Sequence, residues 1–303
     1  MAENRTALFS RKQPGGVWTV ENLREHPGAV WFVDSGAGVD SAGYGKNPDA
    51  PFATLDYAIG NCTASKGDVI YVMPGHAETC TAAVTMDVAG VSIIGLGRGQ
   101  NRPALTASGA IDLITVTADD CHIENLRLLG ASANVTALVN IAAADLSMEK
   151  LLFEPAATPL MTITVASGGH RFHLKDFKWI GSADGPDAFI NFETSASDDW
   201  IVEDGFINAT NSGIDIAVFR AHEDTTAGGV IKNVVAIGVD AMFIDFNSSS
   251  AVGEGLIWDC ACQTAGAVTA TAVYDLGGYG MKNFGISDGA NRAAILHPAT
   301  SAT

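Results

Sequence analysis

Basic residues are scarce in this sequence, and charge of either sign is sparse. The 303 residues include 17 Lys and Arg against 34 Asp and Glu, so the formal net charge is −17, and charged residues make up only 17%. Contacts to nucleic-acid phosphates need clustered cations, so we expect no nucleic-acid partner. Hydrophobic residues make up 47%, which excludes an intrinsically disordered chain.

Long apolar runs are also absent. No segment reaches the ~18 consecutive apolar residues that a membrane helix requires, so we expect no membrane partner. Residues 1–5 (MAENR) are not followed by the apolar stretch of a signal peptide. We therefore expect synthesis in a cytoplasm without secretion by a signal peptide.

The five cysteines stand at irregular spacings, and Cys260 and Cys262 form a C-x-C pair instead of the C-x-x-C of zinc and redox sites. Residues at i and i+2 of a strand point to one face, so buried structural thiols are the simpler interpretation. Four histidines stand at three different phases of the repeat described next, namely His122, His170, His173 and His222. We expect no metal and no cofactor.

A five-residue pattern recurs along the chain, for example at residues 122–126 (HIENL), 147–151 (SMEKL) and 230–234 (VIKNV). Its fourth residue, which we call the anchor, recurs at intervals of 24 to 29 residues. The anchors are Asn125, Lys150, Asp176, Asp204, Asn233, Asp259 and Asn283. A fixed period of this length indicates a repeat architecture.

The residues around the anchors form columns of constant character. The position two residues before the anchor is always apolar. The positions one and three residues after it are also apolar, and Gly205 is the single exception. Because the spacing from −2 to +1 is odd, a period-2 strand cannot pass straight through the anchor, and a tight bend is expected there. Asn and Asp tolerate the positive φ of such bends, which leaves Lys150 as the exception.

A second group of strands is expected upstream of each anchor, with a polar centre between apolar neighbours, as in residues 114–116 (ITV) and 190–192 (INF). Short strands stacked at this period predict an all-β parallel β-solenoid of about nine to ten coils. Before the coils, apolar spacing predicts a helix over residues 52–59.

The first hundred residues also carry motifs of a known superfamily. Residues 45–55 (GKNPDAPFATL), 67–75 (GDVIYVMPG) and 90–97 (GVSIIGLG) resemble the opening of right-handed parallel β-helix proteins of the pectate-lyase-like superfamily. The resemblance implies a short capping helix and a β-helix domain over residues 31–290, between an arm at residues 1–30 and a tail at residues 291–303. A short chain with such an arm also resembles virion structural proteins of tailed bacteriophages.

Glycoside hydrolases of this fold suggest which residues could form a catalytic site. Glycosidases need two carboxyl groups roughly 5–10 Å apart. Adjacent coils would bring together three such pairs: Asp176 with Asp204, Glu124 with Glu149, and Asp245 with Asp275. Asp176 and Asp204 are the catalytic candidates, although any acidic solenoid forms such pairs by chance, so a non-enzymatic role is favoured and enzymatic activity stays open.

Two other patterns have simpler explanations than a functional site. Calcium needs several carboxylates around one ion, whereas Asp119 and Asp120 stand three coils from Asp198 and Asp199, so solvated turn acids are favoured. Residues 95–99 (GLGRG) lack the spacing and the following helix of a dinucleotide-binding loop, so a turn between coils is expected.

The column two residues after the anchor is the most informative surface feature. Alternation predicts that it points outward, yet four of its members are apolar: Leu152, Phe206, Val235 and Ala261. An exposed apolar strip on a soluble protein usually marks an interface. We expect it to serve self-association, as a homotrimer by analogy with phage β-helices. Among the tryptophans, Trp179 is expected in the core, Trp258 outside as a contact, and Trp200 in either place.

These patterns favour a virion structural protein, a trimeric capsid decoration protein located in the virion. It would bind the major capsid protein or another virion protein through the arm, with Arg5, Arg11, Lys12 and Trp18 as attachment residues. The alternative is a tailspike-type protein that binds or cleaves host polysaccharide as a hydrolase or lyase.

Overall fold

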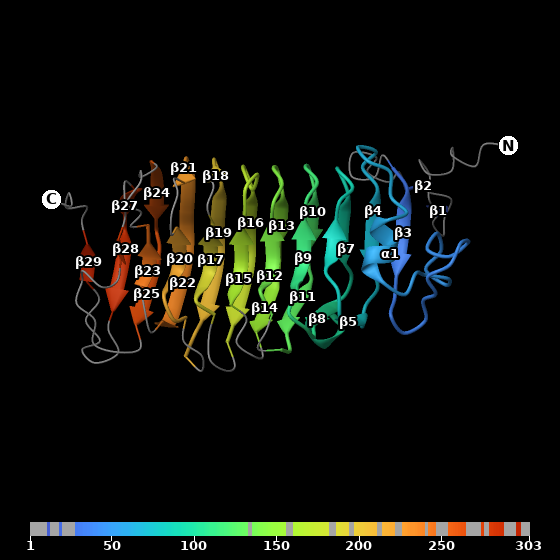
Figure 1. Ribbon diagram of the computed structural model, residues 1–303, viewed down its shortest axis with the longest axis horizontal. Helices are drawn as coiled ribbons and strands as arrows, with labels where there is room; N and C mark the ends of the chain where they lie inside the picture. Colours follow the sequence, from blue (N-terminus) through green and yellow to red (C-terminus); the bar gives the residue numbers. More distant parts are fainter. Residues whose placement is uncertain are drawn as a thin grey trace.

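The computed structural model describes residues 11–12, 18–19, 28–132, 135–155, 160–181, 186–193, 197–210, 214–221, 226–239, 242–246, 254–264, 274–275, 279–287 and 295–297. Within these residues the chain is an all-β parallel β-helix, which confirms the predicted fold class. Successive coils lie side by side along the long axis, from β3 near one end to β28 near the other (Figure 1). Each coil has three facets, which we call first, second and third in chain order.

The first facet contains the strands that precede the anchors. They are β3 (Val30–Val33), β4 (Val69–Val72), β7 (Ser92–Gly95), β10 (His122–Glu124), β13 (Ser147–Glu149), β24 (Gly255–Trp258) and β27 (Tyr279–Lys282), together with the first halves of β16 (His173–Ile180), β19 (Ile201–Asn208) and β22 (Gly229–Val239). All pairings among them are parallel.

The second facet follows the anchors and belongs to the same seventeen-stranded sheet. It contains β5 (Ala77–Cys80), β8 (Ala104–Ala107), β11 (Arg127–Gly130), β14 (Leu152–Pro155), β25 (Ala261–Thr264) and β28 (Phe284–Ser287), with the second halves of β16, β19 and β22. We expected every strand to break at its anchor. The strands β16, β19 and β22 instead continue through the bend at the anchor, because neighbouring coils stay paired on both sides of that bend.

The third facet is a separate eight-stranded parallel sheet. Its strands are β6 (Val84–Met86), β9 (Asp112–Val116), β12 (Ala137–Ile141), β15 (Met161–Val165), β17 (Ala188–Phe192), β20 (Ala217–Ala221), β23 (Met242–Asp245) and β26 (Tyr274–Asp275). These are the polar-centred strands expected upstream of the anchors. In the described part of the chain, eight strands are stacked here and ten in the first facet, and the solenoid has about seven turns where nine to ten coils were expected.

Four short strands lie outside the three facets. β1 (Arg11–Lys12) and β2 (Trp18–Thr19) pair antiparallel, and β18 (Ser197–Asp198) pairs parallel with β21 (Thr226–Ala227). A 3₁₀ turn spans Gly99–Asn101 after β7. Gly97 and Gly99 have positive φ, and residues 95–99 form a turn as predicted, although it lies between β7 and β8 of one coil and not between coils.

The anchors form one corner of the coil, as predicted. All seven have φ between 50° and 57°, including Lys150. The backbone N–H of Asn125 donates to the carbonyl of Glu149 in the next coil, at 3.0 Å, and that of Lys150 donates to Lys175, at 3.1 Å. The bend therefore leaves these backbone groups paired between coils.

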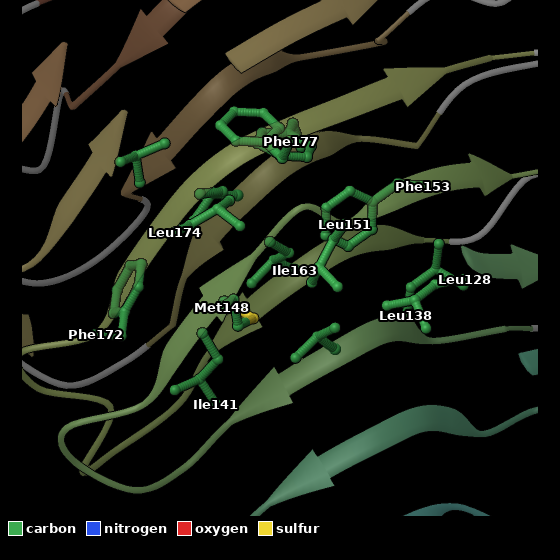
Figure 2. Close-up of a cluster of buried hydrophobic side chains, with 14 of the residues drawn as sticks. Leu128, Leu138, Ile141, Met148, Leu151, Phe153, Ile163, Phe172, Leu174 and Phe177 are labelled. Atoms are coloured by element: carbon green, nitrogen blue, oxygen red, sulfur yellow. The ribbon is translucent and has the colours of Figure 1, made fainter. Parts of the chain in front are cut away.

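Inward side chains of the three facets form one continuous core. The columns at −2 and +1 from the anchors are buried throughout, and so is the +3 column from Leu128 to Cys262. Figure 2 shows part of it, with Met148, Leu151 and Phe153 of one coil beside Leu174 and Phe177 of the next. Trp179 is fully buried, as predicted, and its indole N–H donates to Thr162 Oγ1 at 3.0 Å.

Trp200 also belongs to the core. Its ring stacks on Phe172, with centroids 5.9 Å apart, and contacts Phe192 and Phe246. Trp258 points outward as expected, and the Lys282 ammonium lies 4.8 Å from its ring centroid.

The N-terminal end of the first facet and the C-terminal end of the second facet are covered. At the N-terminal end, Phe32 on β3 donates its N–H to Gly45 and accepts one from Phe52, and α1 (Leu55–Ile59) buries Leu55 and Ile59 below them. At the C-terminal end, β29 (Ile295–His297) pairs antiparallel with β28. Such covers stop strand-by-strand addition of another chain.

The capping helix is shorter than the predicted segment 52–59. Asp40 accepts hydrogen bonds from the backbone N–H groups of Ala53 and Thr54 and from the Thr54 hydroxyl, at 2.7 to 3.1 Å. Thr54 is held extended, so the helix begins at Leu55.

Candidate functional site

Polar side chains form a straight column along the outward surface of the third facet. In register from coil to coil, its members are Thr85, Thr115, Asn140, Thr164, Asn191, Arg220 and Asp245. We call this set the polar column. Its neighbours in each strand, such as Ile190 and Phe192, point inward and are buried, so alternation directs the column away from the core.

The middle of the polar column is shielded from solvent although it points outward. Thr164 is only 5% exposed and Asn191 6%. Among the described residues, the buried Oδ1 atoms of Asn140 and Asn191 and the buried Nε of Arg220 have no hydrogen-bond partner. Asn140 is oriented by its own amide nitrogen, which donates to Asp112 Oδ2 at 2.8 Å, so its free oxygen is held in place.

Three unpaired polar atoms in one column are unusual, because a buried polar group without a partner costs roughly 1–3 kcal/mol. Asn140 and Asn191 are two strands apart, or ~10 Å, and Arg220 is ~4.8 Å further along. The column therefore holds two acceptors and one donor in a line, and a molecule that satisfies them must displace the atoms that shield them and supply the complementary groups.

The candidate catalytic pair lies elsewhere. Asp176 and Asp204 occupy neighbouring anchors at the corner between the first and second facets, and both are exposed. Asp204 accepts a hydrogen bond from the side-chain amide of Asn233 at 2.7 Å. Both residues have positive φ, which Asp tolerates better than most residues. This conformation is a sufficient reason for Asp at both positions.

Glu124 and Glu149 are also brought into register, and a cation lies between them. Lys150 Nζ is 2.8 Å from Glu124 Oε1 and 3.1 Å from Glu149 Oε1. Partial burial raises the pKa of Glu124, but the hydrogen bond and charge of Lys150 outweigh it and hold that pKa below its usual value. A lowered pKa does not suit Glu124 to be a general acid.

Further along the first facet, Glu203 is the centre of a second charged group. His173 Nε2 lies 3.2 Å from it, and the ammonium groups of Lys232 and Lys175 lie at 3.6 and 3.7 Å. These charges compensate one another between coils. The third predicted pair, Asp245 and Asp275, is in register on β23 and β26.

The predicted apolar strip has the expected orientation. Phe206 is 37% exposed, and Leu152, Val235 and Ala261 are partly exposed in the same outward column. What the strip contacts stays a prediction. The side chains of Arg5, Arg11, Lys12 and Trp18 lie outside the described residues, as does His222.

Most of the cysteines are buried thiols, as predicted for Cys260 and Cys262. Cys80, Cys121, Cys260 and Cys262 are buried, Cys62 is partly buried, and none of the five forms a disulfide. Burial raises the pKa of Cys262 to about 12 and that of Cys260 to about 11. Thiols with such pKa values are poor nucleophiles near neutral pH.

The turn acids are separate, as predicted. Asp120 and Asp199 are three coils apart and have positive φ. Within the described ranges, no three His, Cys, Asp or Glu side chains gather as metal ligands do. The part of the chain that the structure describes also contains no helix long and apolar enough to span a membrane.

Sequence reasoning missed a second corner of the coil, five residues before the anchors. Its members with positive φ are Gly90, Asp120, Asp145, Arg171, Asp199 and Gly228. Their backbone N–H groups bond to the next coil, and Arg171 forms a two-point ion pair with Asp145. The recurrent Asp and Gly at this offset were the signal that could have revealed it.

Comparison with known proteins shows the fold alone. No family model matches the chain, and no curated protein matches it. A solved structure titled "Rhamnogalacturonan lyase" is similar with a TM-score of 0.51 and 16% identity, over 86% of this chain and 66% of that one. A GH136 lacto-N-biosidase from Eubacterium ramulus has a TM-score of 0.43 and 12% identity, over 80% and 51%.

This chain thus spans just under two thirds of the lyase and about half of the biosidase. What the first likeness shows is the architecture, a parallel β-helix.

Proposed function

We propose that this protein binds a polysaccharide along the polar column of the third facet. The observation that carries the proposal is the set of unpaired buried atoms on Asn140, Asn191 and Arg220, which lie in one line along the helix axis. Binding sites combine shielded surface with a few placed polar groups, and this column has both features.

The ligand must donate to two amide oxygens and accept from a guanidinium N–H. Sugar hydroxyls do both, and a polysaccharide repeats them along its length much as the strands repeat along the solenoid. The net charge of −17 disfavours a nucleic acid, the other long polymer rich in hydrogen-bonding groups. The lyase is named for a polysaccharide, but at 16% identity it supports only the fold.

The test is binding to arrays of bacterial capsular and O-antigen polysaccharides. We expect Asn191→Ala and Arg220→Met to weaken binding about tenfold or more, as loss of a hydrogen bond to a placed ligand should. Gln263→Ala, at an exposed position on β25 of the second facet, is the matched control and should bind as the wild type does. A folded wild-type protein that binds no glycan, or equal binding by all variants, would refute the proposal.

A second candidate is the structural virion component expected from the sequence, supported by the exposed apolar strip at Leu152, Phe206, Val235 and Ala261. A trimer would bury this strip, and the arm at residues 1–30 would attach it to a capsid or other virion protein. Immunogold electron microscopy of phage particles tests this role: label on heads supports decoration, label at tail tips supports a polysaccharide-binding spike, and no label contradicts both placements.

A further inference from the structure

The second facet carries more exposed apolar surface than the four predicted residues. The outward columns two and four residues after the anchors also contain Leu129, Ile180 and Ile237. Ile180 is 39% exposed and lies on β16, next to β19, which carries Phe206 at 37%. The apolar residues follow one another over six successive strands from β11 to β25, or ~24 Å along the axis.

Charge is distributed differently on this facet from the rest of the protein. The charged residues of these two columns, within the described residues, are Arg127, Glu154 and Lys178. Arg127 and Glu154 form an ion pair, so the two columns together have a net charge of +1 in a chain of −17. Two copies of so acidic a chain repel each other over most of their surface, and least where this facet meets its equivalent.

The edge of the facet carries two opposite charges without partners. Asp176 and Lys178 stand on β16, both are exposed, and neither side chain forms a hydrogen bond or ion pair within the described residues. They are two residues apart on one strand, so in an interface between two copies each could meet the other's counterpart. A surface that binds its own copy needs such self-complementarity.

We infer that the second facet is the surface through which two copies of this chain associate. Phe206 and Ile180 form its apolar centre, and Asp176 of each copy pairs with Lys178 of the other. The inference goes beyond polysaccharide binding and concerns a different facet. Loss of association and loss of glycan binding can therefore be distinguished.

The experiment measures the mass of the full-length chain by sedimentation equilibrium and light scattering over a wide range of concentration. We expect the wild type to associate, and Phe206→Ser to raise the dissociation constant at least about tenfold, as for a central interface residue. Circular dichroism and thermal unfolding establish that the variant is folded. A wild type that stays monomeric, or association unchanged in Phe206→Ser, would overturn the inference.

A charge-exchange cycle tests the pairing itself. Lys178→Glu and Asp176→Lys should each weaken association, and the double variant should restore it. Lysine is tolerated at an anchor, as Lys150 shows. Asp176→Lys reduces the net negative charge, so general repulsion predicts tighter association, the opposite result. Lys66→Glu, at an exposed position outside the facets, is the control and should change little. Failure of the double variant to recover would refute the pairing.

Discussion

The phenyl ring of Phe177 occupies the space that a side chain on Gly205 would need. The two residues are register partners on β16 and β19, and a Cβ atom on Gly205 would lie 2.1 Å from Phe177 Cζ. The ring is held there by stacking on Phe189, with centroids 5.1 Å apart. This explains why Gly205 is the exception in an otherwise apolar column.

Gly205→Ala should therefore destabilise the protein by about 1–3 kcal/mol, the usual cost of overpacking a core. Urea unfolding followed by tryptophan fluorescence measures the change. Gly109→Ala, where a Cβ would meet nothing within 4 Å, is the control and should lie within about 0.5 kcal/mol of the wild type. Equal effects of the two substitutions would disprove the packing explanation.

The second corner makes a prediction about backbone conformation. Asp120 has φ of 58° and an exposed side chain. Asp120→Val should cost about 1–2 kcal/mol, because β-branched residues are strained at positive φ, while Asp120→Gly should be neutral or stabilising. Thermal unfolding of the two variants compares them at one site, and a valine variant as stable as the glycine variant would contradict the corner geometry.

The Glu124–Lys150 contact predicts a pH dependence. Because Lys150 lowers the pKa of Glu124 in the folded protein, the contact stabilises the fold above the ordinary pKa of 4.5, and this stabilisation is lost as the pH falls through the lowered value. Lys150→Met should raise the pKa of Glu124, measured by NMR titration of its carboxyl carbon. The stability difference from the wild type should be larger at neutral pH than in acid. A difference independent of pH would rule out this linkage.

Thiol reactivity tests the burial of the cysteines. Burial raises the pKa of Cys62, Cys80 and Cys262 to about 12, so the folded protein should react only slowly with a thiol reagent at pH 8. All five cysteines should react at once in denaturant. Fast stoichiometric labelling of the native chain would show that these thiols are accessible.

The coil could be predicted from the sequence because two kinds of residue recur with its period. Apolar columns mark the inward positions, and Asn or Asp marks the positive-φ anchors. Lys150 is the exception to the Asn or Asp pattern at the anchors. The bend itself does not favour lysine, but the Lys150 side chain forms ion pairs with Glu124 and Glu149. Trp200 could not be placed, since it lies beside a turn, where alternation gives no direction.

The polar column was visible in the sequence only as a polar centre within each strand. Its shielding and its unpaired atoms depend on how neighbouring coils surround Asn191, and no local pattern encodes that. For the carboxylate pairs, the sequence predicted the positions of the residues but suggested a catalytic role that their positions do not require. Adjacency between coils was predicted correctly for Asp176 and Asp204, yet the corner geometry explains both residues without catalysis.

The most direct test of the account is a crystal structure of the protein with the polysaccharide fragment that binds most tightly on the array. We predict sugar hydroxyl groups within hydrogen-bond distance of Asn140 Oδ1, Asn191 Oδ1 and Arg220 Nε, along the outward surface of β12 to β20. A glycan bound at the corner that carries Asp176 and Asp204, with the third facet unoccupied, would contradict the central claim.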